Sequence, residues 1–170
     1  MIKQDISENL VKPIYLAIGS NLGNRKSNIE KAKIKILENG IKILKSSNFY
    51  ETLSWPNIKN PKFLNIILEI KTKILPNELL KKCKKIEVEL GRKKTEKNSP
   101  RVCDIDIIDY KDKQLRGDLI LPHPRMHKRN FVLFPLFELN KDWKHPILKQ
   151  NIKKLISSLP DKDIRSIKQI

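Results

Sequence analysis

The sequence predicts an α+β fold, a ferredoxin-like α/β sandwich with a mainly antiparallel sheet and helices packed on its faces. Short apolar runs that end at glycine or asparagine, such as residues 14–18, are typical of buried strands. Two longer stretches, 24–38 and 76–90, carry apolar residues at helical spacing. The predicted order β-α-β-β-α-β-β-α-α supplies one sheet and the helices that cover it.

Turn and cap residues divide the chain into these elements. Asn39-Gly40 and Gly91 are stop signals for the first two helices, and Pro76 suits the first turn of the second helix. The stretch 63–71 is apolar on both of its alternating faces, which predicts a central strand. The full set of expected strands is 14–18, 41–50, 63–71, 102–110 and, after a turn at 111–113, 119–121. The expected helices are 24–38, 76–90, 131–139 and 152–159, with long loops at 51–61 and 92–101.

The composition indicates one globular domain, 1–170, in which the polar residues 1–12 form a loose arm. Apolar residues make up 39% and charged residues 32% of the chain, which excludes a disordered protein. The longest apolar run, 131–134, is far shorter than the ~20 residues of a membrane span, and the N-terminus has no signal-like stretch. We therefore expect a cytoplasmic protein without a membrane partner. Cys83 and Cys103 lack metal-binding spacing and are expected as reduced, semi-buried thiols.

The net charge of +17 has two interpretations. A strongly basic domain can bind nucleic acid, but such a footprint should be localised. Lysines occur here on almost every segment, so a solvated basic surface is the favoured interpretation. Its positive field would still attract a polyphosphate.

The strongest local signal is Asp104-Ile105-Asp106, inside the strand expected at 102–110. Strand residues i and i+2 point to the same face, with Cα atoms about 6–7 Å apart, so both carboxylates project together. Two adjacent anions favour a cation between them, and Mg²⁺ binds through one or two carboxylates plus substrate phosphates. The pattern predicts a magnesium–phosphate site. Because this motif is common, a solvated pair on an exposed strand is the alternative.

Basic side chains surround this pair in the sequence. They are Arg92, Arg101, His123, Arg125, His127 and Arg129. Arginine suits bidentate phosphate binding, so the cluster fits a nucleoside polyphosphate with its metal ions. Candidates for a flat heterocycle pocket are Trp55, Phe63, Asn65 and Phe131. Phe63 and Asn65 share one strand face, which places a stacking ring beside an amide, although both aromatics could equally belong to the core.

Several segments together resemble one family, the 6-hydroxymethyl-7,8-dihydropterin pyrophosphokinases of folate biosynthesis. The resemblance covers about residues 13–140, in order and at suitable spacing. Its segments are 15–23, 47–52, 63–65, 86–87, 91–92, 100–106 and 121–133. The most specific are Pro100-Arg101-Val102-Cys103-Asp104-Ile105-Asp106 and Pro122-His123-Pro124-Arg125-Met126.

The resemblance implies an enzyme that transfers pyrophosphate from ATP to the pterin hydroxymethyl group and releases AMP. Asp104 and Asp106 would hold two Mg²⁺ ions and act in catalysis with Arg92 and Arg101. The ATP contacts would be Glu87, Arg92, Lys94, Arg101, His123 and Arg129. The pterin contacts would be Thr52, Leu53, Trp55, Phe63, Asn65 and Phe131. ATP and the reduced pterin would be the only partners of a monomer that binds no specific nucleic acid.

The sequence departs from the family pattern in the loop at 92–101. Lys97-Asn98-Ser99 replaces a common Arg-Trp-Gly, and Lys94 replaces a second arginine of some members. Trp55, in the other loop, is the candidate to replace the missing aromatic lid. Two other function classes are kept for comparison, a basic nucleic-acid-binding module and a Mg²⁺-dependent nuclease. The nuclease would lose strand cleavage on Asp104→Ala, whereas the pyrophosphokinase would form AMP only with a reduced pterin.

Overall fold

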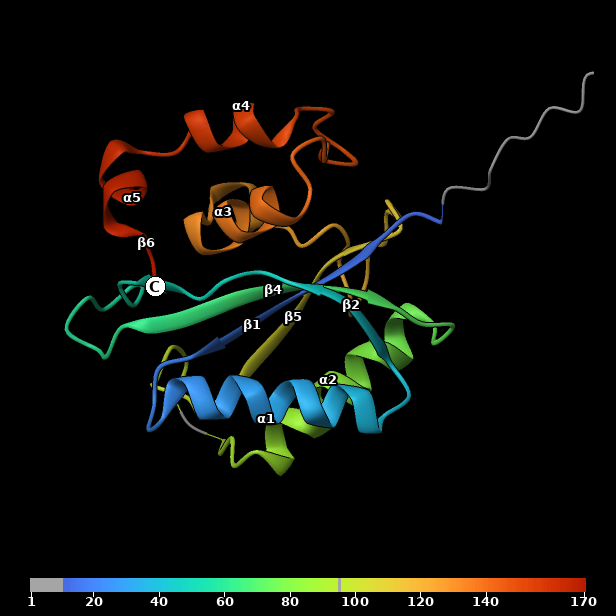
Figure 1. The fold of residues 1–170 in the computed structure, drawn as a ribbon, viewed down its shortest axis with the longest axis vertical. Coiled ribbons are helices and arrows are strands. Elements are labelled where there is room, and N and C mark those ends of the chain that lie inside the picture. The colour runs from blue at the N-terminus through green and yellow to red at the C-terminus, as the bar shows by residue number, and fades with distance from the viewer. Residues whose placement is uncertain (1–10, 95) are drawn as a thin grey trace, which may run out of the picture.

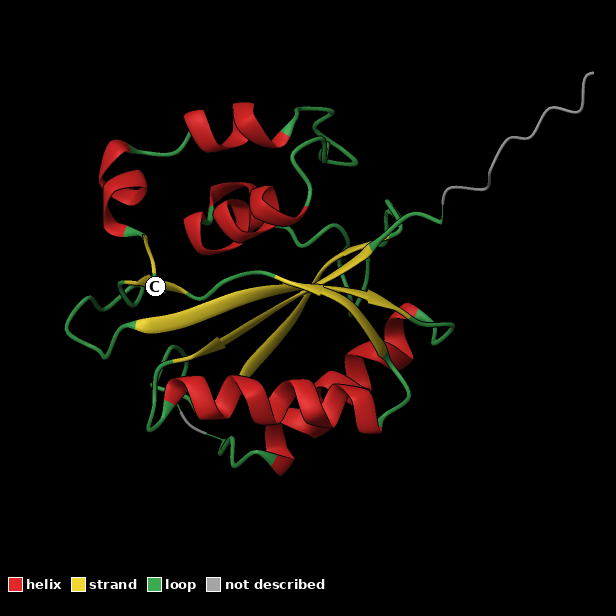
Figure 2. Ribbon diagram, viewed as in Figure 1, coloured by secondary structure: helices red, strands yellow, loops and turns green. Residues whose placement is uncertain are grey.

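The structure, a computed structural model, describes residues 11–94 and 96–170; residues 1–10, most of the expected arm, lie outside this part. It has three layers (Figure 1). A twisted sheet lies in the middle, α1 (Arg25–Glu38) and α2 (Pro76–Glu89) cover one face, and three helices cover the other (Figure 2). These three are α3 (Asn130–Leu139), α4 (Ile152–Ser157) and α5 (Asp161–Ser166). A short 3₁₀ helix, η1 (Met126–Lys128), precedes α3.

All strand pairs of the sheet are antiparallel, as expected. The strands are β1 (Ile14–Ser20), β2 (Lys42–Ser46), β3 (Tyr50–Thr52), β4 (Phe63–Lys71), β5 (Asp104–Tyr110) and β6 (Lys168–Gln169). Their order is β5-β1-β4-β3-β6, and β2 also pairs with β4. The central position predicted for 63–71 is confirmed, because β4 is buried along most of its length between β1 and the β2–β3 side.

The single strand expected at 41–50 was wrong, because the chain forms β2 and β3 with a break at Ser47. The amide of Ile67 donates to the Ser47 hydroxyl at 2.9 Å, and the Ser47 amide donates to the Ile67 carbonyl at 2.9 Å. A side-chain oxygen therefore takes the place of a backbone acceptor and interrupts the regular ladder. After the break, β3 continues to Thr52, which the sequence had placed in a loop.

The return strand expected at 119–121 is also absent. Residues 115 and 121 form only an isolated bridge, with amide-to-carbonyl distances of 3.0 and 3.1 Å. Gly117, with φ of +143°, reverses the chain between residues 115 and 121. Residues 115 and 121 therefore pair with each other, and the segment does not extend along β5 as a strand. The last expected helix ends at Ser157 instead of residue 159, and α5 and β6 follow it unpredicted.

Two apolar clusters hold the layers together. One packs α1 and α2 against the sheet, and the other packs α3 and α4 against the opposite face. Cys83 and Cys103 lie in the first cluster as free thiols, and burial raises the pKa of each to about 12. No helix in 11–94 or 96–170 has the length and apolar character needed to cross a bilayer.

Candidate active site

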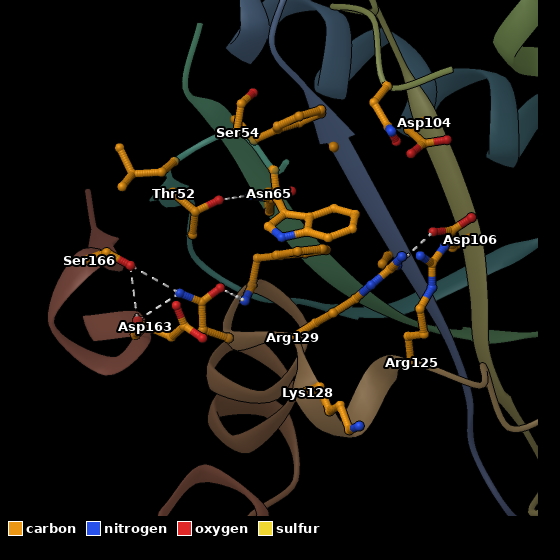
Figure 3. Close-up of a pocket in the computed structure, with 18 of the residues that line it drawn as sticks. Thr52, Ser54, Asn65, Asp104, Asp106, Arg125, Lys128, Arg129, Asp163 and Ser166 are labelled. Atoms are coloured by element: carbon orange, nitrogen blue, oxygen red, sulfur yellow. Dashed lines mark hydrogen bonds and ion pairs between the residues drawn. The ribbon is translucent and has the colours of Figure 1, made fainter. Parts of the chain in front are cut away.

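One cavity of about 550 Å³ opens where β1, β4 and β5 meet the loops beside them (Figure 3). This volume suits a small-molecule site. Segments far apart in the sequence line it, including the end of β1, residues 52–58, the start of β4, residues 125–131 and α5. The cavity contains the predicted acidic pair at one side and the predicted pterin residues at the other.

The acidic side of the cavity is built on β5. Asp104 and Asp106 face the cavity from alternate positions of this strand, with 25% and 31% of their side chains exposed. Burial acts to raise the pKa of Asp104, but the charges of Arg101, Arg92 and Lys84 outweigh it and lower the pKa below its usual value. The Asp104 carboxylate is thus held ionised at neutral pH, as a metal ligand must be.

Two arginines meet Asp104. The Arg92 Nη1 lies 2.7 Å from Asp104 Oδ1, and the Arg101 Nη1 lies 3.5 Å from Asp104 Oδ2. The same Arg92 Nη1 lies 2.6 Å from Glu87 Oε2, so its guanidinium bridges the helix α2 and the strand β5. Arg92 does not line the cavity itself and reaches it through Asp104.

Glu87 is buried, with 2% of its side chain exposed, and its carboxylate is fully engaged by the protein. Besides Arg92 it accepts hydrogen bonds from Lys84 Nζ at 2.9 Å and from the Ile105 amide at 2.7 Å. Burial raises the pKa of Glu87, against the opposing effects of Lys84 and the Ile105 amide. Glu87 therefore positions Arg92 and the strand that carries the aspartates.

Asp106 has its own basic partners from the loop before α3. The Arg129 Nη1 lies 3.4 Å and the His123 Nε2 lies 3.9 Å from Asp106 Oδ2 (Figure 3 shows the Arg129 contact). Burial and then the charge of Arg129 lower the pKa of His123, so this imidazole is neutral at pH 7. Arg125 and Lys128 also line the cavity, which makes this side of it strongly basic.

The opposite side of the cavity carries a buried amide and hydroxyl. Asn65 on β4 donates from Nδ2 to the Thr52 hydroxyl on β3 at 3.1 Å. Gly19 on β1 lies directly behind this amide, because a Cβ there would stand 2.8 Å from Asn65 Oδ1 and 3.4 Å from the Phe63 ring. A glycine is therefore needed at position 19 for Asn65 and Phe63 to sit where they do.

Two of the three aromatic rings that line the cavity, those of Phe63 and Phe131, lie beside arginines of its basic side. The Arg101 guanidinium carbon lies 5.6 Å from the Phe63 ring centroid, and that of Arg129 lies 5.3 Å from the Phe131 centroid. Such separations permit cation–π attraction. The two halves of the cavity are consequently in direct contact at two places.

Asn21, after β1, fixes two loops against each other. Its Nδ2 donates to the Ser54 hydroxyl and to the Pro61 carbonyl, both at 3.1 Å. Its Oδ1 accepts from the Arg101 amide at 2.8 Å. The turn after β1 therefore holds the 53–62 loop and the Arg101 segment in place.

Residues 15–141 match a family described as 7,8-dihydro-6-hydroxymethylpterin-pyrophosphokinase (HPPK). The chain belongs to this family. A 2-amino-4-hydroxy-6-hydroxymethyldihydropteridine pyrophosphokinase of Aquifex aeolicus (strain VF5) is 45% identical over 141 residues, 82% of this chain and 88% of that protein. A protein of the same name from Bacillus subtilis (strain 168) is 39% identical over 127 residues, covering 74% and 76%. HPPK membership favours the pyrophosphokinase interpretation over the nucleic-acid-binding and nuclease alternatives.

Solved HPPK-DHPS structures share the fold. One in complex with substrates has a TM-score of 0.72 at 15% identity and covers 93% of this chain and 46% of that one. A Plasmodium falciparum HPPK-DHPS with pterin and p-hydroxybenzoate has the same TM-score at 17% identity, covering 97% and 48%. This chain spans about half the length of those proteins. The likeness confirms the predicted ferredoxin-like fold.

The cavity gathers most of the residues predicted for the HPPK site. All the predicted pterin contacts line it, namely Thr52, Leu53, Trp55, Phe63, Asn65 and Phe131. So do Arg101, Asp104, Asp106 and Arg129. Glu87, Arg92 and His123 lie behind them as partners of the aspartates or of each other, and Lys94 lies exposed outside the cavity lining.

The sequence reading missed the contribution of α5. Lys162, Asp163 and Ser166 line the cavity, and Asp163 and Ser166 lie on the same side as Thr52 (Figure 3). A start signal was present, because Pro160 is followed by acidic residues at positions 161 and 163, which stabilise the first turn of a helix. Its place beside the cavity could not be read from the sequence, since it depends on how the chain returns across α3.

Proposed function

We propose that this chain transfers the pyrophosphoryl group of ATP to the hydroxymethyl group of 6-hydroxymethyl-7,8-dihydropterin, with Mg²⁺, and releases AMP. The observation that carries the proposal is that one cavity holds both a pair of carboxylates with arginines and a buried amide with three aromatic rings. The first set suits a metal–polyphosphate and the second suits a flat heterocycle with hydrogen-bonding edges.

The residues present fit a magnesium site. Asp104 and Asp106 offer two carboxylates on one strand face. The charge of each is balanced by an arginine, Arg92 for Asp104 and Arg129 for Asp106. Mg²⁺ commonly uses one or two carboxylates and completes its shell with water and substrate phosphates. We infer that Asp104 and Asp106 hold two ions, which would neutralise phosphate charge and polarise the phosphate being attacked.

The arginines have the positions expected of phosphate-binding groups. Arg101 and Arg129 line the cavity on either side of the aspartates, and Arg92 contacts Asp104 from outside. Binding of the triphosphate would draw these guanidinium groups from carboxylates to phosphate oxygens, with His123 alongside. In the step itself, the pterin hydroxyl oxygen forms a bond to the β-phosphorus of ATP. The bond between the β-phosphorus and the oxygen that bridges it to the α-phosphorus breaks, and AMP leaves with that oxygen. The hydroxyl proton passes to solvent. Such chemistry requires positioning and charge neutralisation more than a strong base.

The pterin would occupy the apolar side of the cavity. Phe63 and Phe131 would provide stacking surfaces, while Asn65 and Thr52 would offer donors and acceptors to the ring edge. Trp55 lines the cavity from the 53–62 loop with 70% of its surface exposed, so it is available to close over the ring when substrate binds. Because the Arg–Phe contacts join the two sides, the reacting hydroxyl and phosphate would meet between them.

The test is AMP release from Mg·ATP with and without 6-hydroxymethyl-7,8-dihydropterin, for the native protein and for Asp106→Ala. We expect pterin-dependent AMP from the native protein and a loss of at least about a thousandfold in the variant, since one of two metal ligands is removed. Asp118→Ala is the matched control, because Asp118 is exposed and outside the cavity lining.

No pterin-dependent AMP from the folded native protein would overturn the proposal. The nuclease alternative would instead give nucleic-acid cleavage that depends on Asp104, and a binding module would give steep salt-dependent affinity for DNA or RNA without turnover. The monomeric state, the absence of a nucleic-acid partner, the single domain and the cytoplasmic location stay predictions from the sequence.

A further inference from the structure

The segment that follows α4 closes one side of the cavity. Three of its side chains, Lys162, Asp163 and Ser166 on α5, belong to the cavity lining. In Figure 3, Asp163 and Ser166 lie on the side of Thr52 and Asn65, whereas Asp104 and Asp106 lie across the cavity. The segment therefore borders the half of the cavity that we assign to the pterin.

A first attachment fixes α5 to the beginning of α3. The Asn130 Nδ2 donates to the Asp163 carbonyl at 2.7 Å and to the Ser166 hydroxyl at 3.4 Å (Figure 3). The Ser166 hydroxyl in turn donates to the Asp163 carbonyl at 3.1 Å. Ile164 packs against the apolar cluster beneath α3 and α4.

A second attachment fixes the end of the segment to the sheet. β6 pairs with β3, where Tyr50 faces Gln169 and Glu51 faces Lys168. The Ile170 amide donates to the Phe49 carbonyl at 2.9 Å, and the Tyr50 hydroxyl lies 3.3 Å from the Gln169 side-chain oxygen. Because β3 carries Thr52 and α3 carries Phe131, the segment contacts two of the elements that supply pterin-side residues.

Asn130 connects the first of these attachments to the cavity. Its Oδ1 accepts from the amide of Phe131 at 2.7 Å, while its Nδ2 holds α5. One side chain thus links the α5 wall to the backbone of an aromatic residue of the cavity. Rotating or losing this amide would move both the wall and the start of α3.

We propose that residues 161–170 form one wall of the pterin site and that Asn130 is the positioning residue that fixes this wall to the Phe131 end of α3. The inference rests on the proposed function and deepens it, because it assigns to the pterin subsite a segment outside the matched range 15–141. The inference predicts that a change in this wall alters the affinity for the pterin but not for the nucleotide, because α5 lies away from the aspartates and their arginines.

The test uses Asn130→Asp, which keeps an oxygen for the Phe131 amide and removes the donor to α5. A carboxylate would then face the Asp163 carbonyl, so we expect the wall to detach and the Kd for the pterin to rise about tenfold. Calorimetric titration with pterin is done in the presence of Mg²⁺ and a non-hydrolysable ATP analogue, and the Kd of the analogue is measured separately. The analogue should bind as it does to the native protein, and the KM for the pterin should rise with kcat changed less than about twofold.

Asn151→Asp is the matched control. Asn151 caps α4 by accepting from the Lys154 amide at 2.9 Å and lies outside the cavity lining. Aspartate is an equally good cap, so this variant should bind both ligands normally. If circular dichroism shows that Asn130→Asp is unfolded, Ser166→Ala serves instead; it removes the longer contact and should raise the pterin Kd about twofold to threefold.

Native pterin affinity in the folded variant would overturn the inference and leave the proposed function intact. An equal loss of pterin and nucleotide affinity would also overturn it, because that result indicates general distortion. Absence of pterin binding and of pterin-dependent AMP in the native protein would overturn the proposed function, and this inference with it.

Discussion

The two halves of the cavity are built in different ways. The phosphate half consists of charged side chains on short contiguous stretches, chiefly Arg101 to Asp106 and His123 to Arg129. The pterin half is assembled from β1, β3, β4, the start of α3 and α5, and its central polar groups, Thr52 and Asn65, are buried and neutral. The structure of the phosphate half depends on charged groups held close together. The structure of the pterin half depends on how closely separate helices and strands approach one another.

This difference predicts two kinds of mutational effect. In the phosphate half, the charge and shape of one group should affect the chemical step, because stabilisation of developing charge in the transition state depends on it. In the pterin half, small changes of volume should affect substrate binding with little effect on the chemical step. Variants that conserve either charge or volume can separate the two.

Arg92→Lys should give the largest effect among these variants. Lysine keeps the positive charge but loses the planar guanidinium. In Arg92 one nitrogen, Nη1, contacts both Glu87 and Asp104, which leaves the other N–H groups to donate to phosphate oxygens. We expect kcat to fall roughly a hundredfold, with the KM for the pterin changed less than about threefold. Steady-state AMP formation at saturating Mg·ATP measures both quantities.

Arg116→Lys is the control for that exchange, because Arg116 is exposed and outside the cavity lining. An Arg92→Lys enzyme with native kcat would show that a point charge suffices at this position. A variant that changes only the KM for the pterin would contradict the division between the two halves.

Gly19→Ala should give an intermediate effect confined to the pterin half. The new Cβ would stand 2.8 Å from Asn65 Oδ1 and displace the amide from the Thr52 hydroxyl. We expect the KM for the pterin to rise about tenfold, while nucleotide affinity stays native. Direct titration with each ligand distinguishes these outcomes.

The same substitution in an Asn65→Ala background tests the cause. Without the Asn65 amide, the added methyl group meets only the Phe63 ring. The rise in the KM for the pterin in the double variant should therefore be smaller than the combined rises of the two single variants. Full additivity would show that Gly19→Ala acts by another route, such as a general shift of β1.

The contrast between the halves also explains what the sequence could predict. The Asp104–Asp106 pair follows from strand periodicity alone, and the fold class follows from the order of apolar runs. Glu87 was expected beside the nucleotide, but no periodicity reveals that its carboxylate is already occupied by Lys84, Arg92 and the Ile105 amide. Those contacts depend on how closely α2 approaches β5.

The pterin half was predicted incompletely. Residue types indicated a flat heterocycle pocket, but the pterin itself and the contacts of Thr52 and Leu53 came only through the family resemblance. Thr52 and Asn65 meet because β3 and β4 pair in one register, after a break at Ser47 that propensity does not predict. The wall formed by α5 depends on one hydrogen-bonded amide, Asn130, and on a two-residue strand, β6. Short elements fixed by tertiary contacts carry too little pattern to be recognised.

Substitution of the third aspartate of β5, Asp109, should give the smallest effect on activity, because this residue is buried but lies outside the cavity. Asp109 is fully buried, receives hydrogen bonds from Trp143 Nε1 at 2.9 Å and from the Asp112 amide at 3.0 Å, and lies outside the cavity lining. Burial raises the pKa of Asp109 to about 6, in the opposite direction to that of Asp104. Buried and away from the cavity, it belongs to the packing of the molecule, and we expect Asp109→Asn to keep native kcat.

Its effect should appear in the pH dependence of stability. A carboxyl group whose pKa is higher in the folded than in the unfolded chain binds protons more tightly when folded, so its contribution to stability grows as pH falls below about 6. Between pH 6.5 and 4.5, the free energy of unfolding of the native protein should rise relative to Asp109→Asn by up to about 2 kcal/mol. Urea unfolding of both proteins at the two pH values measures this difference, in which changes common to both chains cancel. A gap that stays constant with pH would show that Asp109 titrates near its ordinary value, and that burial beneath Trp143 leaves its ionisation unaffected.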